Sequence, residues 1–75
     1  MAAESVLRTI RLSADLTLED VAQAASISVP GYYQIESGQR SAPANVANAI
    51  AARLGVPLDI IFMPVNFAVR KTGTV

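Results

Sequence analysis

Thr17 and Ser28 can each begin a helix, and only residues 18–27 lie between them. Threonine and serine favour the position before the first helical residue, because their hydroxyls accept a backbone N–H bond there. A helix that begins at Thr17 must therefore end before Ser28, which leaves a turn of about three or four residues. Two short helices joined by such a turn form a helix-turn-helix unit, and we expect an all-α fold built around it.

The first of these two helices has a partial capping box. Asp20 occupies the third helical position, where its carboxylate can reach back toward the start of the helix at Thr17. The apolar residues that follow at helical spacing are Leu18, Val21, Ala22 and Ala25. One face of this helix is therefore predicted to be buried.

The second helix covers about residues 28–38. Val29, Tyr32 and Ile35 share one face. Pro30 falls in the first turn, where proline removes no intrahelical N–H bond. Gly38 can adopt a positive φ and end the helix.

Three further helices are predicted around this unit. The first is capped by Ser5 and runs to about Ser13, the fourth covers about Pro43 to Leu54, and the fifth covers Leu58 to Phe62. Their apolar residues at helical spacing are Val6, Leu7, Ile10, Ala14, Val46, Ile50, Ala51 and Leu54. Asp15 and Gly55 are residue types that accept the left-handed conformation at helix ends. We expect a five-helix domain over residues 1–62 and a tail over residues 63–75.

With 75 residues the chain is short enough to be one domain. Many of its hydrophobic residues are alanine, which favours helix and buries little area, so the core should be thin. It has neither cysteine nor histidine, which removes disulfides, zinc-finger spacing and the usual general base. No signal-peptide pattern or membrane span is visible. We expect a cytoplasmic protein that is not an enzyme and has no metal, cofactor, membrane or small-molecule partner.

Two segments carry a family resemblance. Residues 17–40 read TLEDVAQAASISVPGYYQIESGQR, and residues 46–62 read VANAIAARLGVPLDIIF. Together with Arg11 they resemble the Cro/repressor (Xre-type) helix-turn-helix family, from about Val6 to Phe62. The resemblance implies a five-helix domain whose third helix enters the major groove of double-stranded DNA. Such domains usually bind a two-fold site as a homodimer.

Three places depart from the family pattern. Ser26 stands where glycine is common between the second and third helices, and serine has a steric cost if its φ is positive. Ala47 stands where the fourth helix usually has leucine, which thins the core. The segment Val29-Pro30-Gly31 occupies the main base-reading turn, where long polar side chains are expected.

The resemblance also implies roles for individual residues. It gives four base-facing positions, which are Ser28, Val29, Pro30 and Gln34. It gives seven phosphate-facing positions, which are Arg11, Thr17, Leu18, Gln23, Tyr33, Gln39 and Arg40. It further pairs Arg11 with Glu36 across the first and third helices. For Tyr33 and Arg40 the alternative is a side chain that is simply exposed to solvent.

The base-reading turn has limited chemistry. Gln34 can form a bidentate pair with adenine, and Ser28 offers a short hydroxyl. Val29 and Pro30 can contact only the methyl group of thymine. These residues predict modest base specificity, supported by the shape of the DNA. The alternative is that this turn no longer reads DNA and contacts a protein instead.

Charge is distributed unevenly along the chain. Residues 1–38 carry two arginines against five acidic residues, whereas residues 39–75 carry four basic residues against one acidic residue. The expected DNA face therefore has few cations, and the salt dependence of binding should be shallow. Dimerisation would double the phosphate contacts.

Within the tail, residues 65–69 alternate apolar with small or polar side chains, which is the period of a short strand. Within the chain we expect no strand to pair with it, so the segment is predicted to pair with its copy in a second subunit. The residues predicted at this dimer interface are Phe62, Met63, Val65, Phe67 and Val69. The alternative is a flap folded over the fifth helix.

These features together favour a sequence-specific transcriptional regulator, in particular a repressor of the prophage or plasmid type. The alternative is a protein-interaction module, such as an antitoxin-like or repressor-binding partner. That module would keep the fold and have little DNA specificity.

Overall fold

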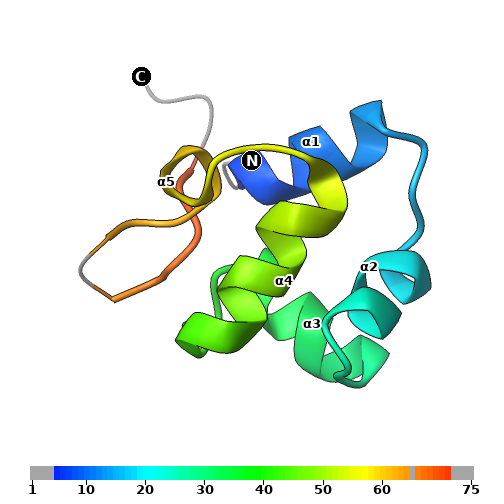
Figure 1. Ribbon diagram of the computed structural model, residues 1–75. Helices are drawn as coiled ribbons and strands as arrows, with labels where there is room; N and C mark the ends of the chain where they lie inside the picture. Colours follow the sequence, from blue (N-terminus) through cyan, green and yellow to red (C-terminus); the bar gives the residue numbers. More distant parts are fainter. Residues whose placement is uncertain (1–4, 65, 72–75) are drawn as a thin grey trace.

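The structure, a computed structural model, describes residues 5–64 and 66–71. Its helices are α1 (Val6–Ser13), α2 (Leu18–Ala24), α3 (Val29–Glu36), α4 (Ala44–Leu54) and α5 (Leu58–Ile61), arranged as Figure 1 shows. The five predicted helices are confirmed. Three of them are shorter than predicted: α3 ends at Glu36, two residues before Gly38, while α4 begins one residue later and α5 ends one residue earlier.

The predicted helix caps are present. The hydroxyls of Ser5 and Ser28 each accept a backbone N–H from three residues later, at 3.1 Å. Thr17 and Asp20 form a complete capping box: the Thr17 hydroxyl accepts the Asp20 N–H at 3.1 Å, and the Asp20 carboxylate accepts the Thr17 N–H at 2.9 Å. A cap stabilises a helix by about 0.5–2 kcal/mol, which matters for a helix as short as α2.

The four longer helices end in the same way. A residue just after each helix has a positive φ, and these residues are Asp15 (60°), Ser26 (58°), Gly38 (84°) and Gly55 (70°). After α2, the Ser26 N–H bonds the Gln23 carbonyl and the Ile27 N–H bonds the Ala22 carbonyl, both at 3.0 Å. This is the Schellman arrangement, which glycine adopts most easily. Ser26 adopts it at a cost of roughly 1–2 kcal/mol, as its departure from the family pattern predicts.

The described core is small and rich in alanine. Its buried apolar residues are Leu7, Val21, Ala22, Ala25, Tyr32, Ile35, Ala42, Val46, Ala47, Ile50, Ala51, Ile61, Phe62 and Val69. Five of these fourteen are alanine, so the core is thin as predicted. Ala47 is fully buried on α4, the helix that packs on both α2 and α5. Ala14 was expected on the inward face of α1, but α1 ends at Ser13 and Ala14 is exposed.

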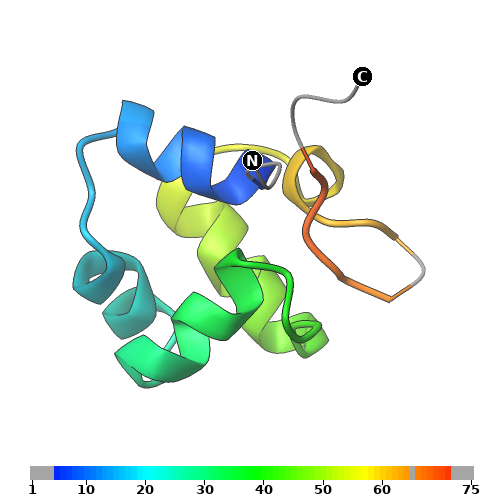
Figure 2. The ribbon, with the colours of Figure 1, turned by 180° about the vertical axis from the view of Figure 1, so that it is seen from behind.

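The chain after α5 turns and returns beside α5 to the start of α1, as Figure 2 shows. Isolated antiparallel bridges join Phe62 to Val69 and Ser5 to Lys71. Arg70 is held from both sides: its N–H donates to the Ile61 carbonyl at 2.8 Å, and its carbonyl accepts the Val6 N–H at 2.7 Å. The tail therefore ties the last helix to the first.

This arrangement corrects the prediction for the tail. The prediction assumes that the tail finds no partner within the chain, and the bridges of Val69 and Lys71 show that this assumption is wrong. Phe62 and Val69 are 0% and 4% exposed inside their own subunit, so they cannot form an exposed dimer patch without unfolding the tail. The described residues contain no strand, and Phe67 has a φ of 53°, which interrupts the alternation. Val65 lies outside the described residues.

The division between a domain and a separate tail at residue 62 is not seen in the packing. Phe67 accepts the Ala42 N–H at 3.2 Å, and Val69 is part of the main core. Residues 66–71 therefore pack as part of the helical domain. The flap considered as the alternative is the arrangement in the structure.

Candidate nucleic-acid interface

The helix α3 has its first turn at the edge of the molecule away from α5 and the tail, as both ribbon views show (Figures 1 and 2). It packs against α2 through the turn at residues 25–28. Tyr32, Ile35 and Glu36 point inward and are buried, whereas residues 28–30, 33 and 34 are exposed. One side of α3 is therefore free to contact a partner.

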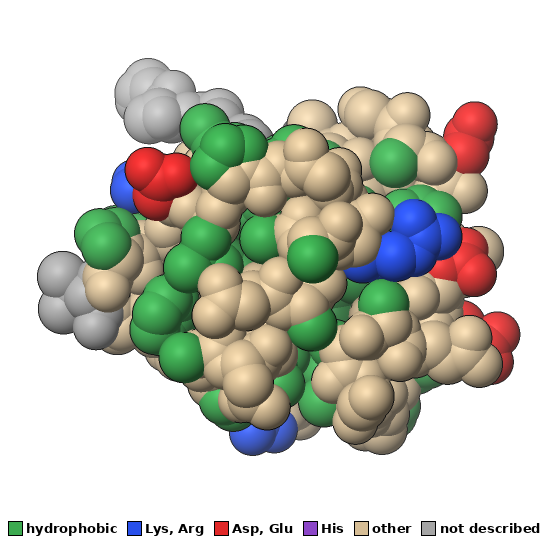
Figure 3. Space-filling model, in the orientation of Figure 1, with side chains coloured by type: hydrophobic (Ala, Val, Ile, Leu, Met, Phe, Trp, Pro, Cys, Tyr) green, Lys and Arg blue, Asp and Glu red, His purple; other side chains and the backbone are tan. Residues whose placement is uncertain are grey.

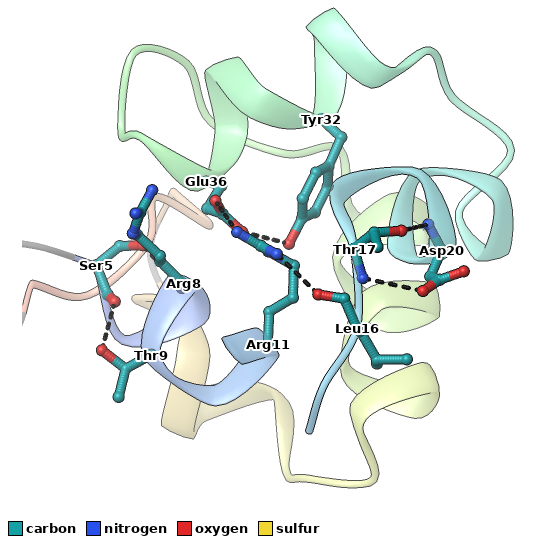
Figure 4. A network of polar contacts seen from close by, with 9 residues as sticks. All are labelled: Ser5, Arg8, Thr9, Arg11, Leu16, Thr17, Asp20, Tyr32 and Glu36. Atoms are coloured by element: carbon teal, nitrogen blue, oxygen red, sulfur yellow. Dashed lines mark hydrogen bonds and ion pairs between the residues drawn. The ribbon is translucent and has the colours of Figure 1, made fainter. Parts of the chain in front are cut away.

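A buried polar network fixes the position of α3 relative to α1. Arg11 on α1 donates through Nε to Glu36 Oε1 at 2.6 Å and through Nη2 to Glu36 Oε2 at 3.2 Å. Its Nη1 donates to the Leu16 carbonyl at 2.8 Å, as Figure 4 shows. The bidentate geometry suits a guanidinium and a carboxylate. The predicted pairing of Arg11 with Glu36 is confirmed.

Tyr32 is a third member of this network that the sequence reasoning did not assign. Its hydroxyl donates to Glu36 Oε1 at 2.9 Å (Figure 4). The spacing of four residues on α3 brings the two side chains together, and a buried tyrosine hydroxyl usually has a partner. Burial and the neighbouring Glu36 carboxylate raise the pKa of Tyr32 well above its ordinary value. The hydrogen bond from Arg11 to Glu36 raises the pKa of the guanidinium. The network therefore keeps the guanidinium charged and the phenol neutral.

The same geometry argues against the predicted phosphate contact of Arg11. Its side chain is only 7% exposed, and all three guanidinium nitrogens donate to protein acceptors. A phosphate contact would break a buried pair, which typically costs about 3–5 kcal/mol. Arg11 holds α3 in position instead.

The predicted base-facing residues are all accessible: Ser28, Val29, Pro30 and Gln34 are exposed on α3 and its cap. The Ser28 oxygen accepts the Gly31 N–H at 3.1 Å, which leaves its own hydrogen free for an acceptor on a base. Gln34 Oε1 accepts a long bond of 3.4 Å from Arg40 Nη1. The structure thus brings a predicted base reader and a predicted phosphate ligand together.

The start of α2 fits its predicted role less well. The Thr17 N–H, which could otherwise hold a phosphate, already donates to Asp20. Hydrogen bonds from the Thr17 backbone and hydroxyl lower the pKa of Asp20, so this carboxylate stays ionised at neutral pH. An anion therefore already occupies the start of α2 and disfavours phosphate at Thr17. Leu18 is only partly exposed.

Four polar or aromatic candidates for backbone contact remain accessible, namely Gln23, Tyr33, Gln39 and Arg40. Tyr33 is 45% exposed on α3, which agrees with its predicted outward direction. Gln39 and Arg40 lie in the loop after α3, where both backbone N–H groups donate to the Gln34 carbonyl, at 2.8 and 3.2 Å. These bonds hold the loop close to the exposed side of α3.

Charges on the visible face are sparse. Figure 3 shows acidic side chains at the edge formed by α2 and the segment before it and again beside α5, while the basic side chains stand at separate places. No continuous basic patch covers this face.

Within residues 5–64 and 66–71, no three acidic, histidine or cysteine side chains gather in a way that could hold a metal ion. Across the same residues, every helix is too short or too polar to cross a membrane.

A comparison with protein families decides the class of the fold. A family model described as Helix-turn-helix matches residues 7–61, which is more than half of the chain. The chain belongs to the Cro/repressor (Xre-type) helix-turn-helix family. The matched region runs from α1 to the end of α5 and contains the whole buried network.

Membership establishes the coarse class of function. The chain is a DNA-binding helix-turn-helix domain of a regulatory family that is generally not enzymatic. The resemblance noted from the sequence is thereby confirmed. A search of curated proteins finds no match to this chain.

Proposed function

We propose that this chain is a sequence-specific transcriptional regulator that represses by placing α3 in the major groove of double-stranded DNA. The observation that carries the proposal is that α3 exposes one side to solvent while buried hydrogen bonds fix its other side. Ser28 and Gln34 are exposed on α3, while Glu36 on the same helix is clamped by Arg11 and Tyr32. A helix held rigidly from behind can present the same side chains to every site.

In this proposal the bases are read by few groups. Gln34 pairs with adenine through its amide, and the Ser28 hydroxyl donates to a base acceptor. Val29 and Pro30 contact thymine methyl groups, and Gln23, Tyr33, Gln39 and Arg40 hold the phosphate backbone. With one long reader on each helix, specificity is modest and depends partly on the shape of the DNA.

The regulator acts as a homodimer on a two-fold site. A single subunit offers too few cations for tight binding, and a two-fold axis would place two copies of α3 about 34 Å apart. Because Phe62 and Val69 are buried, the contact is assigned to the exposed apolar side chains Ile60 and Met63. Ile60 belongs to α5 and Met63 follows it, and α5 lies at the end of the molecule away from the first turn of α3 (Figure 1).

Selection of binding sites from random duplex DNA tests the proposal. The expected result is an enriched site with two similar halves about one helical turn apart, bound by two copies of the chain. A selection that yields no common sequence, with binding that disappears at modest salt, would contradict it.

A second function has one observation in its favour. Val29 and Pro30 give the first turn of α3 an exposed apolar surface with no charge. A protein partner would suit this surface better than a base edge does. The selection experiment separates the two functions, because a protein-interaction module would enrich no DNA site.

A further inference from the structure

A cleft of about 290 Å³ opens beside the first turn of α3. It lies between the turn that precedes α3, one side of α3 and the start of α4. Its lining residues are Ile27, Ser28, Gly31, Ile35, Arg40, Pro43 and Val46. Ser28, Arg40 and Pro43 are exposed at its mouth, whereas Ile35 and Val46 form a buried floor.

Gly31 keeps this cleft open. Its φ is not positive, so the helix does not require glycine here, and glycine costs about 1 kcal/mol in a helix relative to alanine. A Cβ at this position would approach only the Ser28 oxygen, at 3.0 Å, and would meet no backbone or core atom within 4 Å. The backbone conformation at Gly31 is therefore one that a residue with a side chain could also adopt. The missing side chain leaves one wall of the cleft bare.

The lining defines the chemistry of a ligand. Ile27, Ile35, Pro43 and Val46 supply apolar walls, and the polar groups are the Ser28 hydroxyl and the Arg40 guanidinium. No acidic side chain lines the cleft, so its one charge is positive and attracts an anion. Arg40 makes only a long bond of 3.4 Å to the Gln34 amide, which a stronger acceptor can replace.

We propose that this cleft binds a small amphipathic carboxylate, with its apolar chain on Ile35 and Val46 and its carboxylate on Arg40. The volume is near the lower end of the range for ligand sites and suits a molecule of roughly ten non-hydrogen atoms. A carboxylate and a guanidinium form paired charge-assisted hydrogen bonds, which fix the orientation of the ligand.

The ligand would act as an inducer, a conclusion that rests on the proposed function. Arg40 is the basic residue assigned to DNA phosphate, and it contacts the base reader Gln34. A carboxylate on Arg40 competes with the phosphate and adds a negative charge beside the reading turn. Ligand binding therefore lowers the affinity for DNA, and by linkage DNA lowers the affinity for the ligand.

The test uses the whole chain without DNA. Octanoate is the probe, and octanol and octylammonium are the matched controls. Amide shifts in a ¹⁵N correlation spectrum report where each probe binds. We expect saturable shifts for octanoate at residues 27–46 and much weaker effects for the two controls. Arg40→Gln should raise the dissociation constant by about tenfold or more, while Arg53→Gln, at the other end of α4, should not change it. Gly31→Leu should abolish binding by filling the cleft.

Equal responses to all three probes, or an Arg40→Gln variant that binds octanoate as well as the parent does, would overturn the proposal. A second arm adds octanoate to the complex with a selected DNA site, where the DNA dissociation constant should rise about tenfold. Unchanged DNA affinity at saturating octanoate would refute the inducer role. A chain that binds octanoate but no DNA would refute the proposed function and leave the cleft assignment standing. A chain that binds DNA but no octanoate would refute the cleft assignment and leave the proposed function standing.

Discussion

Tyr32 joins two properties that are usually separate, a core aromatic ring and a hydrogen bond to a buried charge. Replacing it by phenylalanine removes the bond to Glu36 and leaves the ring. Tyr32→Phe should therefore lower the free energy of unfolding by about 1.5–3 kcal/mol at neutral pH. Chemical denaturation measures this change, with Tyr33→Phe as the exposed control, which should have little effect.

The raised pKa of Tyr32 adds a dependence on pH to the same prediction. The folded protein favours the neutral phenol, so the stabilisation is complete below the ordinary tyrosine pKa of about 10 and is lost as the pH rises above it. Tyr32→Phe should lack this alkaline component. An alkaline loss of stability of equal size in the parent and in Tyr32→Phe would assign it to another group.

Ser26 is a residue whose backbone conformation is known to be unfavourable for its type, with a φ of 58°. Ser26→Gly removes the steric cost, although glycine also gains freedom in the unfolded chain. The net result should be a gain of roughly 0.5–1 kcal/mol in the free energy of unfolding. Ser37→Gly is the matched control, because Ser37 has a φ of −81°, and it should destabilise. Melting temperatures that fall for both variants would contradict this account.

The charge of Arg40 should strengthen DNA binding without affecting which bases are preferred. Arg40→Ala should weaken DNA binding evenly across sequences and reduce the slope of log K against log salt by about one per subunit. Titrations at several salt concentrations measure the slope, with Arg53→Ala as the control. An unaltered slope would show that Arg40 touches no phosphate.

At the scale of elements, local signals in the sequence predict the helices well. Three of the helix starts follow from one hydroxyl each, at Ser5, Thr17 and Ser28, because a cap depends only on neighbours three residues away. The ends of α1 and α3 are also predicted by single residues, Asp15 and Gly38, since the left-handed conformation depends on residue type.

The tail shows where such reasoning stops. The alternation around Phe67 is typical of a strand, but whether it pairs within or between chains depends on contacts far apart in sequence. The bonds of Arg70 to Val6 and Ile61 have no local signature. Sequence periodicity could therefore suggest an extended segment and could not identify its partner.

Val69 tests the role assigned to the tail. The side chain is buried in the core of its own subunit, so Val69→Ala should lower the free energy of unfolding by about 1–3 kcal/mol. Leu12→Ala changes an exposed apolar side chain on α1 and should have little effect on stability. Thermal unfolding at two protein concentrations separates folding from association. Equal stability of parent and Val69→Ala would show that the tail does not pack as described.

At the scale of the whole molecule, the sequence predicts the scaffold of the candidate site better than its chemistry. The pairing of Arg11 with Glu36 could be predicted because family positions carry it. The geometry that argues against a phosphate contact of Arg11 could not be predicted, since it consists of the third bond to the Leu16 carbonyl and of burial. The cleft beside Gly31 could not be predicted either, because its walls come from three separate segments of the chain.

The central claim is that α3 reads bases through Gln34, and the most direct test measures where one substitution changes preference. Affinities of the parent and of Gln34→Ala are compared over all single-base variants of the selected site. The account predicts that Gln34→Ala loses about 1–3 kcal/mol and no longer discriminates at one base-pair position of each half-site, with preferences elsewhere unchanged. A Gln34→Ala variant that keeps full affinity and the same preference at every position would contradict it.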